Sequence, residues 1–335
     1  MPETANRIPP IWFERLGYRL SLPKWLGAVF FGAAPFGLLG TIAALLPGQS
    51  VGLLDTFVFV GVVLSLVFAL SVFYISSYLR REIGDLLEYA LSMQSPGESG
   101  AMNLDLSALA SLRKTMIPYA LLLVFTVPVF TLGGGGDFIV NLEGELPYLW
   151  FNFILATFFW TFGYSMYSIH RMGKLPLTLK SHTEDKTLGL KPFGKASLNS
   201  TLIYFGVVSA LFAVVATGGA IPPGLALLFL GMFPIGLVMF LLPLRILHRK
   251  LNDAKQATYA RIAPRYRQIV ESVSNGAKVD QNMANEMAVV VEIRNDILQI
   301  HSWPFDTGVF IKLAAIVLSV SAILLSALIR DLLHI

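Results

Sequence analysis

The sequence contains no cysteine, and it carries little charge for its length. Without a thiol the chain can form no disulfide, no thiolate metal site and no cysteine nucleophile. Charged residues make up 14% of the 335 residues, whereas a soluble globular domain usually carries about 25%. Because 55% of the residues are hydrophobic, the composition predicts an integral membrane protein with the lipid bilayer as its main partner.

Other chemical signatures are missing as well. No acid or base lies deep inside a long apolar run, although ion-coupled transporters and pumps usually place one there. The glycine-rich stretch 133–136 lacks the Lys-Ser/Thr pair of a phosphate-binding loop. The histidines lack the spacing that would put two metal ligands on one helix face: His170, His182, His248 and His301. We therefore predict no catalytic residue, no metal site and no cofactor, and no basic patch that would bind nucleic acid.

Long apolar runs are what the sequence does contain. A spanning helix needs roughly 20 apolar residues, and seven runs qualify: 26–46, 51–79, 117–132, 147–169, two within 196–244, and 309–329. We split the stretch 196–244 at the Gly/Pro-rich turn 218–224, because a single helix of that length does not fit a bilayer. The prediction is an all-α, polytopic membrane bundle of seven transmembrane helices. Proline could interrupt three of the runs, at Pro35, Pro128 and Pro234.

The connections between the runs alternate in charge. Lys and Arg occur before the first run and in the second, fourth and sixth connections, whereas the first and fifth have no charge and the third has only acids. The positive-inside rule then predicts a cytoplasmic N-terminus and an external C-terminus, in a plasma or inner membrane. The predicted parts are an N-terminal segment (1–25), six transmembrane helices (26–246), a cytoplasmic hairpin (247–306) and a seventh transmembrane helix (307–335).

Two polar segments have helical periodicity. In the N-terminal segment, Trp12 and Phe13 oppose Arg15 and Arg19, which predicts a helix lying in the membrane interface; a loosely ordered tail is the alternative. In the sixth connection, two amphipathic stretches flank the turn signal at Asn275. Their apolar positions predict the seam of a helical hairpin: Ile262, Tyr266, Ile269 and Val273 in the first stretch, and Met283, Met287, Val290 and Ile297 in the second.

The stretch His301–Gly308 joins the second amphipathic stretch to the last apolar run. Pro304 disfavours helix at the residue before it, and Asp306 can cap the helix that follows. We therefore predict a hinge that couples the cytoplasmic helices to the last span, formed by Trp303, Pro304, Asp306 and Gly308. An ordinary loop with a helix cap is the alternative.

Two spans carry stripes of small or polar residues. In the last span the stripe runs through Ala315, Ser319, Ala322 and Ser326. We predict that it lines a pore at a symmetry axis, with helix packing as the alternative. In the fourth span, the stripe of Thr157, Thr161, Tyr164 and Ser168 predicts the wall of a ligand cavity, and here too packing within the bundle is the alternative.

Together these features resemble the seven-transmembrane ion channel superfamily, which includes the insect odorant and gustatory receptors. The resemblance covers most of the chain and lies in its architecture, that is, in the number, orientation and order of the predicted helices. It implies a homotetramer in which the last helix lines a central pore and the stretch Ile262–Ile300 joins the subunits. We carry three hypotheses forward: a homo-oligomeric ion channel, a non-conducting membrane scaffold or signalling protein that docks partners on its cytoplasmic helices, and, less favoured, an enzyme or transporter.

Overall fold

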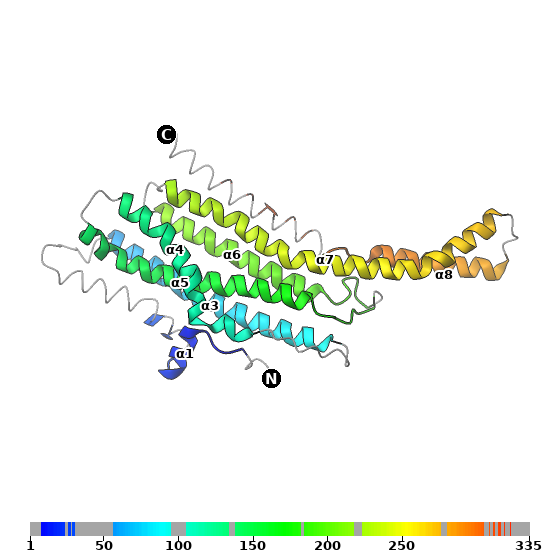
Figure 1. Ribbon diagram of the computed structural model, residues 1–335, viewed down its shortest axis with the longest axis horizontal. Helices are drawn as coiled ribbons and strands as arrows, with labels where there is room; N and C mark the ends of the chain where they lie inside the picture. The colour runs from blue at the N-terminus through cyan, green and yellow to red at the C-terminus, as the bar shows by residue number, and fades with distance from the viewer. Residues whose placement is uncertain are drawn as a thin grey trace.

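Helices make up nearly all of the described chain (Figure 1). The computed structural model describes residues 8–23, 56–94, 105–133, 138–181, 184–217, 223–275 and 280–304, with isolated positions at 26, 27, 29, 30, 308, 311, 314, 315, 318 and 322. The elements are α1 (Trp12–Arg19), α3 (Thr56–Ser92), the 3-10 turn η2 (Leu106–Ala110), α4 (Leu112–Gly133), α5 (Phe138–Gly173), α6 (Lys191–Thr217), α7 (Pro223–Ser274) and α8 (Gln281–Gln299). Within these ranges no β-strand forms, so the all-α prediction is confirmed.

Helix α5 is the centre of the bundle, since it packs against α3, α4, α6 and α7. Its buried side chains recur at steps of three and four: Ile154, Phe158, Phe162, Met166 and Ile169. The ring of Phe162 stacks on that of Tyr204 from α6, with centroids 4.5 Å apart. The Tyr204 hydroxyl donates to the carbonyl of Met232 in α7 at 2.8 Å, so one tyrosine ties three helices together.

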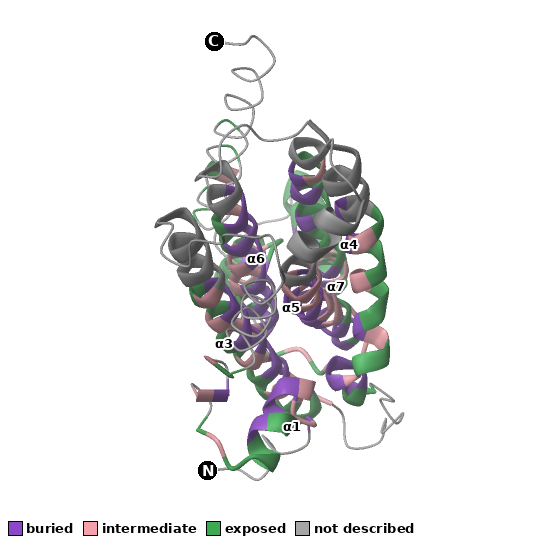
Figure 2. Cartoon of the chain, turned by 90° about the vertical axis from the view of Figure 1, so that its left-hand side faces the viewer, coloured by how far each residue is buried: buried purple, intermediate pink, exposed green. Residues whose placement is uncertain are grey.

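The outside of the bundle is apolar over much of α4 and α7. Seen end-on, buried residues line the faces that the helices turn toward one another, and exposed residues lie outside (Figure 2). The exposed residues of α7 include large apolar side chains: Leu230, Ile235, Leu237, Val238, Met239, Leu241 and Leu242. Those of α4 include Met116, Ile117, Leu121 and Val124. An apolar surface this continuous is unusual for a protein in water. Among the described residues, one helix (Leu228–Ser274) is long and apolar enough to cross a membrane, by length and composition only.

Helix α7 has 52 residues, which makes it about 78 Å long at 1.5 Å per residue. It contains Pro234, Pro243 and Pro264 and still continues as one helix. The break considered at Pro234 therefore does not occur, and α4 likewise continues through Pro128. Neighbouring helices that pack around a proline can compensate for its missing hydrogen bond. Helix α7 is longer than the helices it packs against, and its second half projects beyond them (Figure 1).

The projecting part is an arm, residues 251–299, made of the second half of α7 and all of α8 (Figure 1). Asp280 caps α8 by accepting the Met283 N–H at 2.7 Å. Between the two helices, Ile269, Val290 and Ile297 are buried. Val273, predicted for the same seam, is 45% exposed because it lies in the last turn of α7, beyond the part of the seam that α8 covers.

The predicted helix boundaries can be compared only where the structure describes the chain. Helix α6 ends at Thr217, directly before the turn predicted at 218–224, and α7 begins at Pro223, within the last two residues of that predicted turn. Most of the first predicted span (26–46) and of the last (309–329) lies outside the described residues.

Candidate functional site

The segment His301–Pro304, called the elbow here, is bound to two other parts of the chain. The His301 N–H donates to the carbonyl of Lys186 at 3.1 Å, and the Lys186 ammonium donates to Gln299 at 2.7 Å. Lys255 of α7 donates to the carbonyls of Leu298 and Ile300 at 3.1 and 3.2 Å. Carbonyl groups at a helix C-terminus lack partners within the helix, so Lys255 caps the end of α8 that leads into the elbow.

His248 of α7 holds the elbow from the other side. Its imidazole Nδ1 lies 2.7 Å from the carbonyl of Ser302, and its ring stacks on that of Trp303 with centroids 4.4 Å apart. A carbonyl can only accept, so Nδ1 carries the proton. In the neutral ring, Nε2 is then an acceptor for the Asn252 amide at 3.0 Å. The contacts thus select one tautomer of His248.

Pro304 is buried and lies against Gly194 in the first turn of α6. A Cβ built at Gly194 would lie 2.5 Å from the Pro304 carbonyl oxygen and 3.0 Å from the Pro304 Cβ. Only glycine therefore fits at position 194 with the elbow in this place.

The loop before α6 connects the elbow to α3. The Asp185 carboxylate accepts the N–H groups of Thr187 at 2.8 Å and Gly189 at 2.9 Å. Leu188 and Gly189 have φ angles of +52° and +85°, and the Asp185 carboxylate fixes this turn from within. The Tyr89 hydroxyl of α3 donates to the Gly189 carbonyl at 2.9 Å. The loop is therefore an ordered bridge between α3 and the elbow.

Asp185 makes the stability of this bridge depend on pH. Burial alone would raise the pKa of its carboxyl, but hydrogen bonds from Thr187 and Gly189 outweigh burial and hold that pKa below its ordinary value. The Asp185 carboxylate contributes its full stabilisation when the pH is above the pKa of an unfolded-state aspartate, about 3.9. This stabilisation is lost as the pH falls through the lower pKa of Asp185 in the folded protein.

We expect Asp185→Asn to lower the stability by about 1 kcal/mol at pH 7, since the variant loses charge-assisted acceptors but keeps its shape. In measurements from pH 6 to pH 3, the difference in melting temperature between wild type and variant should narrow once the pH falls below about 3.9. Glu184→Gln is the matched control, because Glu184 is exposed. A difference between wild type and Asp185→Asn that stays constant down to pH 3 would contradict this role.

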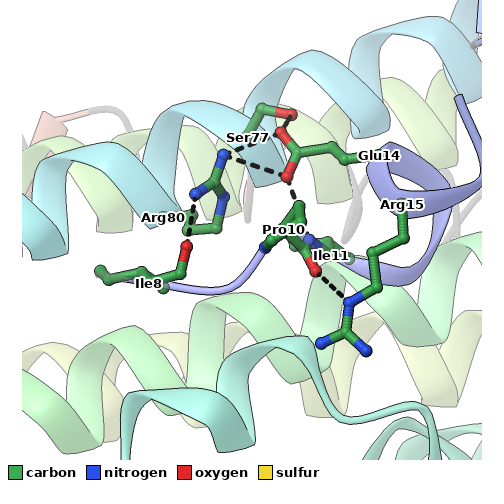
Figure 3. A network of polar contacts seen from close by, with 7 residues as sticks. All are labelled: Ile8, Pro10, Ile11, Glu14, Arg15, Ser77 and Arg80. Carbon is green, nitrogen blue, oxygen red and sulfur yellow. Dashed lines mark hydrogen bonds and ion pairs between the residues drawn. The ribbon is translucent and has the colours of Figure 1, made fainter. Parts of the chain in front are cut away.

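A second polar cluster fixes α1 on α3 (Figure 3). Arg80 and Glu14 form an ion pair at 3.0 Å, and their side chains are 9% and 3% exposed. The Ser77 hydroxyl donates to Glu14 at 2.8 Å, and so does the Ile11 N–H, at 3.0 Å. Arg80 also donates to the Ile8 carbonyl at 3.1 Å. A buried ion pair needs such additional hydrogen bonds to offset its desolvation.

Helix α1 also contacts α5. The Trp12 indole donates to the Thr157 hydroxyl at 3.1 Å, and its ring lies 5.1 Å from that of Phe153, centroid to centroid. Phe13 packs on Phe73 of α3 with centroids 4.1 Å apart. Leu16 remains 37% exposed, so α1 buries its N-terminal turn and leaves apolar side chains outside.

The residues predicted for a ligand cavity lie in the bundle. Thr157, Thr161 and Ser168 are buried, and each hydroxyl donates to a carbonyl four residues earlier, at 3.0, 2.8 and 2.8 Å. The Tyr164 hydroxyl instead donates to the Asp105 carbonyl at 2.7 Å. Thr157 also accepts the Trp12 indole N–H, a contact between α5 and the N-terminal helix that the sequence did not predict. The ligand role of the stripe stays a prediction.

The residues predicted for the pore and the hinge are described only in part. Ala315 and Ala322 are exposed, as is Gly308. Ser319, Ser326 and Asp306 lie outside the described residues. Trp303 and Pro304 form part of the elbow, where their contacts are those given above.

Sequence reasoning missed the Glu14–Arg80 pair. Arg80 directly follows an apolar run, where a basic residue ordinarily indicates only the orientation of the chain in the bilayer. No local signal distinguishes it from Arg81, which is exposed, because its partner comes from 66 residues earlier in the chain.

Comparisons with known proteins place no constraint on this chain: no family model, no curated protein and no solved structure matches it. In the described part of the chain, no three His, Asp or Glu side chains come together in a group that could hold a metal ion.

Proposed function

We propose that the protein is a multi-pass membrane protein that assembles as a homo-oligomer, in which the last helix of each subunit faces a shared ion-conducting pore. The observation that carries this proposal is the spacing of the small residues in the last apolar run. Ala315, Ser319, Ala322 and Ser326 follow one another at steps of four, three and four, and Ala315 and Ala322, the two of them that the structure describes, are exposed in the single chain. This is the spacing of a helix seam that receives another helix.

Small residues in such a seam allow close approach of helices in a bilayer. Ser319 and Ser326 belong to this stripe, each four residues after an alanine, so a helical repeat would put their hydroxyls on the same helix face as Ala315 and Ala322. In a ring of subunits these hydroxyls would border the axis and would be available to wet a pore. The exposed apolar surface of α4 and α7 supports lipid contact on the outside of each subunit. Seven spans, a cytoplasmic N-terminus and an external C-terminus remain our proposal for the topology.

The test is ion flux through reconstituted protein of known stoichiometry. Mass photometry of the nanodisc-embedded protein first gives the number of subunits, and a tetramer is expected. Liposomes should then conduct ions, and Ser319→Trp should abolish the flux while leaving the oligomer intact, because the indole would fill the axis. Ser321→Trp is the matched control, since two residues along a helix place the same bulk on the opposite side. A monomer, or equal flux in both variants, would refute the pore.

A non-conducting scaffold is the second candidate, and the arm favours it. Charges on the α7 part of the arm are mostly basic, whereas α8 is mostly acidic, and both helices expose apolar side chains: Tyr259, Val270, Val289 and Leu298. Such a mixed surface suits a protein partner. A stable monomer or dimer without flux would favour this candidate over the channel.

A further inference from the structure

A cavity of about 320 Å³ lies between α1 and α3. Its walls are mainly aromatic and aliphatic: Phe13, Tyr18, Leu22, Phe73, Tyr74 and Tyr78. A Cβ built at Gly17 meets no atom within 4 Å, so the empty space reaches the backbone of α1. A volume of this size with mostly apolar walls and few polar groups is typical of sites for small molecules.

Besides the tyrosine hydroxyls, the polar groups of the cavity are those of Glu14, Ser77 and Arg81. The Glu14 carboxylate is already compensated, because it pairs with Arg80 at 3.0 Å and accepts the Ser77 hydroxyl at 2.8 Å. Arg81 is exposed and forms no hydrogen bond or ion pair with any residue in the described ranges. The charge that remains available to a ligand is therefore positive.

The position of the cavity indicates the ligand. Arg81 is the second residue after the apolar run 51–79, where the chain passes from lipid tails to headgroups if it spans the membrane as we propose. Leu16 and Leu20, on the same short segment as Gly17, are 37% and 52% exposed. The cavity thus presents an apolar slot and a guanidinium at one boundary, and a guanidinium can bind phosphate through two parallel hydrogen bonds.

We propose that the cavity between α1 and α3 binds an anionic phospholipid of the surrounding bilayer. One acyl chain lies against Phe73 and Tyr74, and the phosphate pairs with Arg81. The lipid completes the contact between α1 and α3, which within the protein consists of one buried ion pair, its hydrogen bonds and a few aromatic rings. This inference rests on the proposed membrane embedding but does not require conduction.

Native mass spectrometry of the full-length protein can test the site with two lipids that share the same chains. Dioleoyl phosphatidylglycerol should bind about fivefold more tightly than dioleoyl phosphatidylcholine, which is the effect of one cation at a membrane surface. Arg81→Gln should abolish this preference. Arg113→Gln, the same change at an exposed position of α4, should keep it. Gly17→Phe should lose both lipids, because the ring fills the slot.

Each remaining outcome decides against one part of the proposal. Equal affinity of the wild type for the two lipids, or an unchanged preference in Arg81→Gln, refutes the anionic site. Tighter binding of oleate than of phosphatidylglycerol would mean that a free fatty acid occupies the cavity instead. Gly17→Leu, a smaller change, tests the slot if Gly17→Phe does not fold. Protein that remains dispersed in buffer without detergent would refute the membrane embedding itself, whereas embedded protein without a lipid preference refutes only the lipid site.

Discussion

Replacement of Arg80 by methionine is expected to release α1 from the bundle and to destabilise the protein by about 3–5 kcal/mol, the usual cost of removing one partner of a buried ion pair. The variant leaves the Glu14 carboxylate, whose side chain is 3% exposed, without its counter-charge. Glu14 would keep the Ser77 hydroxyl and the Ile11 N–H as donors, but neither carries a charge. We expect the melting temperature in detergent to fall by roughly 10 °C.

Amide exchange can show where the loss occurs. Protection in α1 should fall in Arg80→Met, while the buried middle of α5 should stay protected, because local opening needs only the contacts of α1 to break. The double variant Glu14→Leu, Arg80→Met should recover most of the stability, since an apolar pair often replaces a buried ion pair at little cost.

Arg113→Met is the matched control for the loss of one arginine, because Arg113 is exposed. It should change the melting temperature by a few degrees at most. An Arg80→Met protein as stable as the wild type would mean that the ion pair contributes nothing to the docking of α1.

The sequence predicted the helical class of the fold and one of its internal boundaries. Apolar periodicity and the Gly/Pro-rich turn at 218–224 are local signals, and the helix end at Thr217 and start at Pro223 agree with them. The lengths of the helices were harder to predict from the sequence. Helix α3 continues to Ser92 and α7 to Ser274, well past the last apolar residues of their runs. Hydropathy indicates which part of a helix is apolar enough to contact lipid. It does not indicate where the helix ends, because the backbone hydrogen bonds of a helix can continue into polar sequence.

The contacts that define the candidate site could not be predicted, because each joins residues far apart in the chain. Nothing near Thr157 indicates that its hydroxyl will accept the Trp12 indole. Nothing near His301 indicates that its N–H will bind the Lys186 carbonyl. The stretch HSWP signalled a change of chain direction through Pro304, but its anchors come from α6, α7 and the loop that Asp185 organises. A local pattern can therefore locate a joint without revealing what holds it.

A single methyl group at Gly194 should separate the elbow from α6. In Gly194→Ala the new Cβ would lie 2.5 Å from the Pro304 carbonyl oxygen, and backbone on both sides of this contact cannot rotate away as a flexible side chain would. The elbow must shift, which should cost about 1–3 kcal/mol, as overpacking of a buried contact does. The shift should also weaken the bonds from His301 to Lys186 and from His248 to Ser302.

Amide exchange at His301 is the direct measurement, because its N–H is protected only while it donates to Lys186. Exchange should become faster in Gly194→Ala. Gly163→Ala and Gly206→Ala are matched controls: both glycines lie inside helices, and a Cβ at either meets no atom within 4 Å. These two changes should stabilise their helices by up to about 1 kcal/mol and leave His301 protected. If exchange at His301 does not change in Gly194→Ala, Pro304 does not fix the elbow. If exchange at His301 becomes faster and the protein conducts ions, the gating of the same variant can then be measured. Altered gating would show that the elbow couples the arm to the pore. Unaltered gating would show that the elbow is a structural anchor.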